Sequence, residues 1–233
     1  MSLLNFKNDA ERAFNVLGTG GIAILPNDVG YSLIGGSAEA LKKIFDTKRR
    51  APAKLNAMLG NADIHDQLHL VSARSREIIQ AITEDYDLPL GVIAPCRPEH
   101  PMLQQMDREA YQRSTHNNTL LMLMNAGHFH AEICKLSFQH QQPLFGSSAN
   151  ISLSGTKFRV EDINSEIKAI ADIIIDYGLV KYHLYGCSST LLEVETLRVH
   201  RFGSCYENIA DILMRHFRIE LPANPTPSQR EQT

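Results

Sequence analysis

The sequence predicts a single α/β domain in which a twisted, open, mixed sheet is flanked by helices. Short runs of apolar and β-branched residues alternate along the chain with longer segments whose apolar residues recur at helical spacing. A chain of 233 residues can bury one substantial core, and this chain contains no internal repeat and no linker-like stretch. We therefore expect one domain over residues 1–220, followed by a Pro-rich, polar and disordered tail over 221–233.

The composition is typical of a soluble globular protein, with 43% hydrophobic and 21% charged residues. No apolar run approaches the ~20 residues that span a bilayer, and the first residues lack the pattern of a secretory signal. The four cysteines form no Cys-x-x-Cys pair, so we expect free thiols, a cytoplasmic location and no membrane partner. The net charge of −3 excludes no ligand class, because a small basic cleft can lie on a mildly acidic protein.

The first quarter of the chain is expected to supply two helices and two strands. Apolar residues at helical spacing predict a helix over 6–17, and a short apolar run predicts a buried strand over 22–25. Ser37 is the expected N-cap of a second helix that ends near Thr47. A further strand is expected over 55–59.

The rest of the chain continues the same alternation. Residues 95–118 contain three prolines and many polar residues, which predicts a long, mobile excursion over the surface. Ser204 to Glu207 has the pattern of a capping box that opens the last helix. The other expected elements are helices over 72–83, 131–139 and 163–171, strands over 90–94, 119–124, 143–147 and 172–176, and a hairpin of 189–193 with 197–201.

A first candidate site follows the expected strand at 143–147. The strand stops in a turn that carries the hydroxyls of Ser147 and Ser148, the carboxamide of Asn150 and uncrowded backbone N–H groups. Neutral donors of this kind suit phosphate or carboxylate oxygens, and ligands bind at the carboxyl ends of strands in α/β sheets. An ordinary Ser/Asn loop remains the alternative.

A second candidate site is a dense run of cations at the end of the expected second helix. Six basic residues fall within thirteen positions from Lys42 to Lys54, and only Asp46 opposes them. Lys48, Arg49 and Arg50 form its centre. A cluster this dense suits a triphosphate or a nucleic-acid backbone. The alternative is a structural role, because cations offset the negative end of a helix.

A third candidate is the polar turn from Asn27 to Tyr31, directly after Pro26, although a plain β-turn of Asn, Asp and Gly is the alternative.

No metal site is predicted. His65 and His69 have the i, i+4 spacing of helical metal ligands, but they lack the Glu of a His-Glu-x-x-His motif.

Together these junctions resemble the YrdC-like family, the threonylcarbamoyladenylate synthases of tRNA modification. The resemblance runs from about Gly20 to Gly203. Pro26 to Leu33 aligns without gaps with the family's opening motif, Pro-Thr-Asp-Thr-Val-Tyr-Gly-Leu. The other matches follow in the family's order: Lys48-Arg49-Arg50 with Lys54 for its Lys-x-Arg motif, Pro89-Leu90-Gly91 for part of its Pro-Gly-Pro-Leu-Thr strand entry, Ser148-Ala149-Asn150 for Ser-x-Asn, Gly186 to Thr190 for Gly-x-x-Ser-Thr, and Arg201-Phe202-Gly203 for Arg-x-Gly.

The resemblance implies a concave basic cleft that binds ATP, threonine and bicarbonate, forms a carbamoyl-adenylate and releases pyrophosphate. It implies Lys48 and Arg50 as the catalytic residues, acting on the triphosphate. Mg²⁺ that bridges the phosphates is also implied, without a carboxylate cage in the protein. The other implied ligands are Lys54, Ser148, Asn150, Ser189 and Arg201 for ATP, and Asn27 and Tyr31 for the amino acid.

This chemistry needs no protein nucleophile, so the residues hold the reactants in line and offset negative charge. We expect Lys48 and Arg50 to be exposed cations. Their replacement is then expected to weaken ATP binding and to change thermal stability little.

The departures from the family pattern cluster on its amino-acid side. Asn27 and Val29 replace both threonines of the opening motif, and Gly30 and Ser32 replace its Val and Gly. The family usually carries an arginine on the strand before the Ser-x-Asn motif, whereas Leu121 to Asn125 is uncharged. These changes predict retained nucleotide binding with altered or lost handling of threonine.

Three hypotheses follow. The first is an ATP-dependent carbamoyl-adenylate synthase that acts on threonine or a related amino acid. The second is a family member without synthase activity that binds nucleotide, tRNA or double-stranded RNA through the same basic cleft. The third is an enzyme that forms an adenylate from carbamoyl phosphate. A partner protein of tRNA modification that receives the intermediate is compatible with the first.

Overall fold

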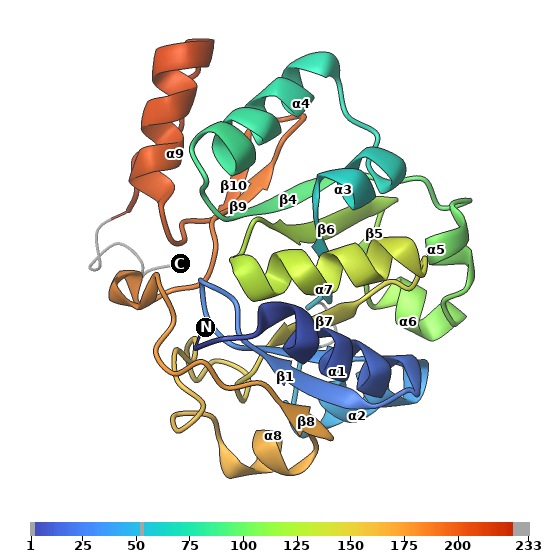
Figure 1. Ribbon diagram of the computed structural model, residues 1–233. Helices are drawn as coiled ribbons and strands as arrows, with labels where there is room; N and C mark the ends of the chain where they lie inside the picture. The colour runs from blue at the N-terminus through green and yellow to red at the C-terminus, as the bar shows by residue number, and fades with distance from the viewer. Residues whose placement is uncertain (1–2, 52–53, 226–233) are drawn as a thin grey trace.

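A mixed sheet of ten strands forms the centre of the molecule in the computed structural model, which describes residues 3–51 and 54–225 (Figure 1). The strands lie in the order β10-β9-β4-β6-β3-β7-β2-β1-β8, and β5 pairs with β6. The pairs β3–β6 and β4–β9 are parallel, whereas others such as β2–β7 are antiparallel. The strands are β1 (Ile22–Leu25), β2 (Ser32–Gly35), β3 (Ala57–Gly60), β4 (Leu90–Pro95), β5 (Thr115–His116), β6 (Thr119–Met124), β7 (Phe145–Ser148), β8 (Ile173–Ile174), β9 (Leu191–Glu193) and β10 (Arg198–Arg201).

Helices flank this sheet on both faces, which confirms the predicted α/β class and its single mixed sheet. Helices α1 and α7 lie side by side on the face turned to the viewer in Figure 1. A smaller apolar cluster lies on the opposite face, under α2 and α8. The α-helices are α1 (Phe6–Gly18), α2 (Ala38–Thr47), α3 (Ala62–Leu68), α4 (Ala73–Gln80), α5 (Pro101–Gln104), α6 (Arg108–Gln112), α7 (His128–Gln139), α8 (Ser165–Ala169) and α9 (Tyr206–Ile212). The segments η1 (Ala81–Asp85) and η3 (Leu213–Phe217) are π-helical, and η2 (His183–Tyr185) is a 3₁₀ turn.

Helix α2 forms as its sequence predicts. The Oγ of Ser37 accepts the N–H of Ala40 at 3.1 Å, so the cap satisfies one of the unpaired donors of the first turn. Ala40, Leu41 and Ile44 are buried on one side of the helix. The helix ends at Thr47, which places Lys48 at its C-cap beside the sheet.

The excursion over 95–118 is ordered, which corrects the expectation of a mobile surface loop. It contains α5, α6 and the short strand β5. Met102, Leu103 and Ala110 are buried in the main core, and this apolar burial offsets the entropy cost of ordering the segment. The carboxylate of Asp107 caps α6 by accepting the N–H groups of Glu109 and Ala110 at 2.8 and 3.2 Å.

The last helix does not begin with the expected capping box. The Oγ of Ser204 donates to the carbonyl of Cys187 at 2.7 Å, and the first turn of the helix has no side-chain capping bond. Cys205 occupies the N-cap position with φ of 62° and without a side-chain capping bond. Ser204 is instead buried, and it forms an isolated parallel bridge with Ser189.

The packed part of the chain extends past the expected boundary at residue 220. Leu221 is buried against the main core, and the hydroxyl of Tyr206 donates to the carbonyl of Pro222. The remainder of the predicted tail, 226–233, lies outside the described residues. Within the described residues, no helix combines the length and apolar character of a membrane span.

His130, in the first turn of α7, is buried and neutral. We therefore expect the stability of the fold to decrease at acidic pH. Its Nε2 lies 3.1 Å from the carbonyl oxygen of Leu123, and burial lowers its pKa from 6.5 to about 4. As the pH falls below 6.5, the unfolded chain takes up this proton first. The folded state then loses about 1.4 kcal/mol per pH unit until the pKa of the folded state is reached.

We expect His130→Gln, which keeps an N–H donor but does not titrate, to lack this contribution. The free energy of unfolding of the parent should fall relative to that of the variant between about pH 6.5 and 4. Urea denaturation of both proteins at several pH values measures the difference. Parallel pH profiles would contradict the assignment of a neutral, buried His130.

Candidate functional site

Lys48 is the centre of the candidate site. Its Nζ donates to the carbonyl of Ser148, at the end of β7, and to Oδ1 of Asn150 at 3.1 Å. The backbone also closes around it, since the N–H of Ser152 donates to the Lys48 carbonyl at 3.1 Å. Residues about a hundred positions apart are thus brought together where α2 and β7 end. The structure therefore joins the Lys-x-Arg and Ser-x-Asn segments in one group, the Lys48 cluster, which consists of Lys48, Arg50, Ser148 and Asn150.

The expectation that Lys48 is exposed is wrong, because only 2% of this residue is accessible. Burial and the nearby charges of Arg50 and Lys54 lower the pKa of Lys48 to about 7. Both causes penalise the ammonium form. The two acceptors of its Nζ are neutral, so they orient the amine without compensating its charge.

Arg50 lies beside Lys48 in a fixed orientation. Its Nη1 donates to Oδ1 of Asn56 at 2.7 Å and its Nη2 to the carbonyl of Leu55 at 2.5 Å. Burial lowers the pKa of Arg50 to about 10, so the guanidinium remains charged at neutral pH. Lys54 is exposed and adds a further positive charge to the same loop.

The described residues provide no carboxylate partner for this group of cations. None of the ion pairs between described residues includes Lys48, Arg50 or Lys54, although Arg49 pairs with Glu166 at 3.2 Å. The charge of Arg50, and that of Lys48 in its ammonium form, is therefore uncompensated, while Arg49 is paired at the surface. Such a cluster favours binding of a polyanion.

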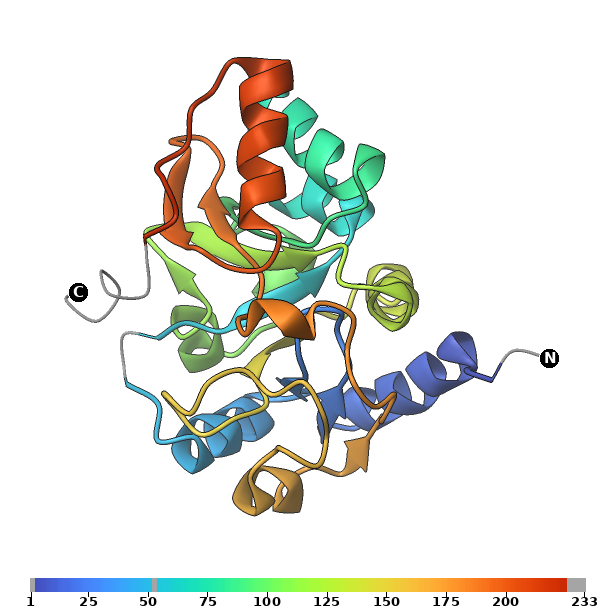
Figure 2. The ribbon, with the colours of Figure 1, turned by 90° about the vertical axis from the view of Figure 1, so that its left-hand side faces the viewer.

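Ser189 and Arg201 form a second pair at the β9–β10 edge of the sheet, where β4, β6 and β3 lie between β9 and β7 in the strand order. Nε and Nη2 of Arg201 donate to the carbonyl of Ser189 at 2.9 and 2.8 Å, and Nη2 lies 3.3 Å from its Oγ. Among the described residues, no hydrogen bond or ion pair links this pair to the Lys48 cluster. Figure 2 shows the β9–β10 hairpin and the loop after α2 on the same side of the molecule, away from α1 and α7.

Asn27, in the opening turn, lies next to the Lys48 cluster through the pairing of β2 with β7. Its Nδ2 donates to the Oγ of Ser32 at 2.9 Å, and Ser32 lies opposite Ser148 in the register of the two strands. The Oδ1 of Asn27 is buried and has no partner among the described residues. Because a buried acceptor of this kind is normally satisfied, it is a candidate contact for a donor group on a ligand.

Tyr31 is placed differently from Asn27. Its hydroxyl donates to Oδ1 of Asp176 at 3.1 Å or to the carbonyl of Gly178 at 2.9 Å, and it accepts the N–H of Tyr177 at 3.1 Å. Its backbone carbonyl accepts the N–H of Ala149 at 2.8 Å. The main chain of Tyr31 therefore supports the Ser-x-Asn turn, while its hydroxyl is already satisfied by the segment from 176 to 178.

Two residues near these clusters were not selected from the sequence. Asn56 holds Arg50, and its only signal was a polar residue directly before an apolar strand. Lys181 lies 3.8 Å from Asp28 of the opening turn, and the N–H of Tyr182 donates to the Asp28 carbonyl at 2.8 Å. No local pattern links these distant segments, so only the fold reveals the contacts.

The described residues do not form a resident magnesium site. They contain no group of three or more His, Cys, Asp or Glu side chains placed to hold a metal ion. In the Lys48 cluster, the carbonyl and amide oxygens are already bound to cationic side chains. These positive side chains repel a metal ion.

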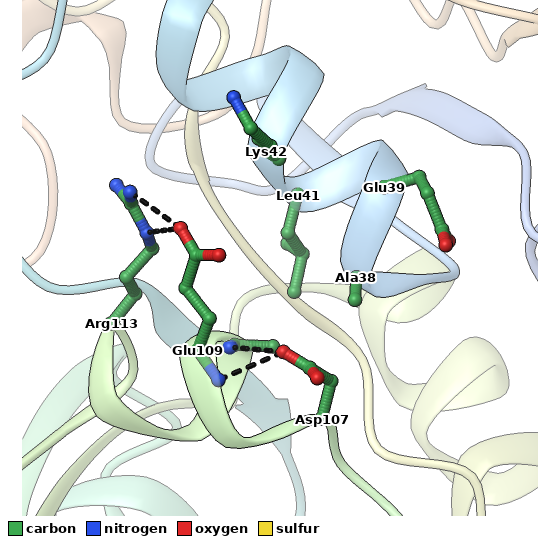
Figure 3. A pocket seen from close by; sticks show the side chains of 8 residues that line it. Ala38, Glu39, Leu41, Lys42, Asp107, Glu109 and Arg113 are labelled. Carbon is green, nitrogen blue, oxygen red and sulfur yellow. Dashed lines mark hydrogen bonds and ion pairs between the residues drawn. The ribbon is translucent and has the colours of Figure 1, made fainter.

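Two cavities lie between α2 and α6, at the end of α2 opposite Lys48. The smaller has a volume of about 210 Å³ and is lined by Glu39, Lys42, Asp107 and Glu109, among others (Figure 3). The larger, of about 390 Å³, shares part of this lining. In Figure 3, Arg113 points toward Glu109, and these side chains are 2.7 Å apart. Neither cavity is lined by a predicted ATP or amino-acid ligand.

Comparison with known proteins places these motifs in one family. A profile of the Sua5/YciO/YrdC family, described as telomere recombination, matches residues 15–203. No match was found among curated protein sequences.

Solved structures show the same fold. A hypothetical protein from Streptococcus mutans, smu.1377c, superposes with a TM-score of 0.69 at 18% identity over 90% of this chain and 92% of its own. The P. abyssi Sua5 complex with L-threonine gives 0.64 at 18% identity over 82% of this chain, and E. coli YciO gives 0.63 at 16% over 84% of this chain and 90% of its own. The present chain covers only 52% of that Sua5, so it spans about half of its length.

Proposed function

The chain belongs to the Sua5/YciO/YrdC family, and on that premise we propose that it is an ATP-dependent carbamoyl-adenylate synthase. One observation carries the proposal: the buried Lys48 and the fixed Arg50 meet at the end of a strand with neutral partners only. Burying cations without counter-ions costs folding free energy. A fold retains such an arrangement when a ligand supplies the negative charge, and a triphosphate has that charge.

Lys48 and Arg50 are assigned to the triphosphate. Their charges offset the negative charge that moves onto the leaving pyrophosphate when the α-phosphorus is attacked. Ser148 and Asn150 hold the Lys48 ammonium in place. The Oγ of Ser148 donates to Oδ1 of Asn150, and Nδ2 of Asn150 donates to the carbonyl of Ile151 at 2.9 Å, so we assign the remaining N–H of Asn150 to a phosphate or ribose oxygen. We assign Ser189 and Arg201 to the other side of the nucleotide, and Lys54 to the solvent end of the phosphates.

The proposed reaction has two steps. The amine of an amino acid first combines with carbon dioxide, giving a carbamate and a proton. A carboxylate oxygen of the carbamate then attacks the α-phosphorus of ATP, and the bond to the bridging oxygen breaks, which releases pyrophosphate. The product is a mixed anhydride of the carbamate and AMP. Because this anhydride is reactive in water, a tRNA or a tRNA-modification partner protein is the expected acceptor.

A second candidate function is nucleotide or RNA binding without turnover. The observation that favours it is the altered amino-acid side, where Asn27 and Val29 replace the threonines of the family motif. The strand β6 and the following Asn125 carry no charged side chain, so the usual arginine is missing there. The Lys48 cluster is intact in this case, and it would bind phosphates of a nucleotide or of double-stranded RNA.

We expect ATP to be consumed with release of pyrophosphate only when both an amino acid and bicarbonate are present. The test measures pyrophosphate across the twenty amino acids, with and without bicarbonate, and ATP binding by calorimetry. ATP binding without pyrophosphate release would favour the second function, as would RNA binding with a steep dependence on salt. Adenylate formation from carbamoyl phosphate instead of an amino acid would contradict both.

A further inference from the structure

We infer that Asn56 is a positioning residue for the phosphate-binding Arg50, and that the excursion over 95–118 supports the nucleotide site through it. The inference rests on the proposed function, because it assigns Arg50 to the triphosphate. It adds a residue outside the matched motifs, and it gives a role to a segment that the sequence predicts to be mobile.

The first step is the contact between Asn56 and Arg50. The Oδ1 of Asn56 accepts from Nη1 at 2.7 Å, while the Leu55 carbonyl accepts from Nη2 at 2.5 Å. Two acceptors from adjacent residues therefore hold both terminal nitrogens of the planar guanidinium. A guanidinium has five N–H donors, so three remain for a ligand after these two bonds.

The second step is the support of Asn56 itself, which is only 5% exposed. Its backbone N–H donates to the carbonyl of Arg113 at 2.8 Å, and its Nδ2 lies 3.3 Å from the Oγ of Ser114. Ser114 is fully buried and donates to the carbonyl of Ala110 in α6 at 2.8 Å. A continuous chain of hydrogen bonds thus runs from α6 through Ser114 and Asn56 to Arg50.

The third step is the anchoring of this chain on α2. The guanidinium of Arg113 stacks over the ring of Phe45 at 4.0 Å from its centroid. Phe45 lies in the last turns of α2, three positions before Lys48. The excursion therefore contacts both sides of the phosphate-binding loop: the helix that ends at Lys48, and the segment that holds Arg50.

The neutrality of Asn56 is the chemical reason for this choice of residue. An aspartate in its place would accept from Arg50 equally well, but it would form an ion pair and cancel the charge that the ligand needs. Asparagine orients the guanidinium and leaves its charge free. This matches the neutral acceptors that hold Lys48.

The test compares ATP binding by Asn56→Ala, by Arg50→Ala and by the double variant. We expect Asn56→Ala to raise the Kd for ATP by roughly fivefold to tenfold, less than the loss of a direct charge-assisted bond to phosphate, because Arg50 keeps its second acceptor at the Leu55 carbonyl. In the Arg50→Ala background, Asn56→Ala should have no further effect, because its target is gone. Equal effects in both backgrounds would overturn the inference.

Two further variants separate positioning from folding. Asn56→Asp keeps the acceptor for Arg50 and adds a negative charge, but it loses the Nδ2 donor to Ser114. We expect a folded protein with weaker ATP binding. ATP binding by Asn56→Asp equal to the parent's would overturn the inference. Asn61→Ala is the matched control: its Oδ1 caps α3 by accepting the N–H of Ile64 at 3.0 Å, so the variant should lose stability and keep the parent's Kd.

The parent protein distinguishes failure of the inference from failure of the proposed function. A parent that binds no ATP overturns the proposed function, and the inference falls with it. A parent that binds ATP while Asn56→Ala binds it equally well overturns the inference alone. Both are supported if the parent binds ATP and Asn56→Ala weakens this binding only when Arg50 is present.

Discussion

Replacing Lys48 by methionine is expected to weaken ATP binding by about tenfold or more while the protein stays folded. A charge-assisted hydrogen bond to phosphate contributes about 1.5–3 kcal/mol, and this corresponds to roughly tenfold or more in Kd. Methionine has a similar length without the charge, so it fills the buried site. The same loss is expected for Arg50→Ala. Titration calorimetry with MgATP measures both.

The stability of the Lys48→Met variant is expected to differ from the parent in its pH dependence. The pKa of Lys48 is about 7 in the folded protein and about 10.4 in an unfolded chain. Between these values the unfolded chain binds more protons, so the parent gains stability as the pH rises and loses it as the pH falls through the window. As the pH rises through this window, the free energy of unfolding of the parent should increase relative to that of the variant by up to about 1.4 kcal/mol per pH unit.

The adjacent Arg49 provides the matched control for both measurements. Its guanidinium pairs with Glu166 at the surface, so Arg49→Ala should keep the Kd for ATP and change stability little. A Lys48→Met variant that binds ATP like the parent would contradict the nucleotide assignment. Equal pH profiles of stability would instead contradict the lowered pKa of Lys48.

Threonine is expected not to be strongly preferred as the amino-acid substrate, if pyrophosphate release is observed. A site that hydrogen-bonds a substrate hydroxyl discriminates on the order of 10⁴-fold against analogues that lack it, whereas a site without such groups reaches on the order of 10²-fold or less. Where the family motif has two hydroxyls, Asn27 offers one acceptor, its free Oδ1, because its Nδ2 is bound to Ser32. The altered turn can therefore accept from a substrate hydroxyl at one atom and offers it no donor. Val29 is buried and carries no polar side-chain atom.

The measurement is pyrophosphate release with threonine, serine and valine at matched concentrations, with and without bicarbonate. Asn27→Thr combined with Val29→Thr restores the two hydroxyls of the family motif, and we expect it to increase the preference for threonine. A large bicarbonate-dependent preference for threonine in the parent would contradict the prediction. It would show that recognition of the threonine hydroxyl does not depend on the two threonines of the family motif.

The sequence by itself was sufficient to predict those helices and strands whose start and end depend on residues a few positions away. The apolar run at 22–25 is strand β1, buried along its whole length, and the Ser37 cap begins α2 as expected. The hairpin of β9 and β10 also lies close to its predicted place. In each case the backbone choice depends on neighbours within one turn or one strand, and those neighbours are visible in the sequence.

The grouping of Lys48 with Ser148 and Asn150 was anticipated only through the order of family motifs. Nothing local links residues a hundred positions apart. The expectation that the excursion over 95–118 is mobile is wrong for a related reason. Prolines and polar residues indicate where a chain leaves regular structure, but burial of Met102 and Leu103 against distant elements decides whether it is ordered.

The tertiary structure alone decided the electrostatic state of the site. Whether Lys48 is exposed or buried, which acceptor holds Arg50, and whether the Tyr31 hydroxyl is free all depend on contacts with remote segments. A residue's type sets which charges and hydrogen bonds are available to it. Desolvation and partner choice are sums over everything packed around that residue, and those neighbours are assembled only when the sheet closes.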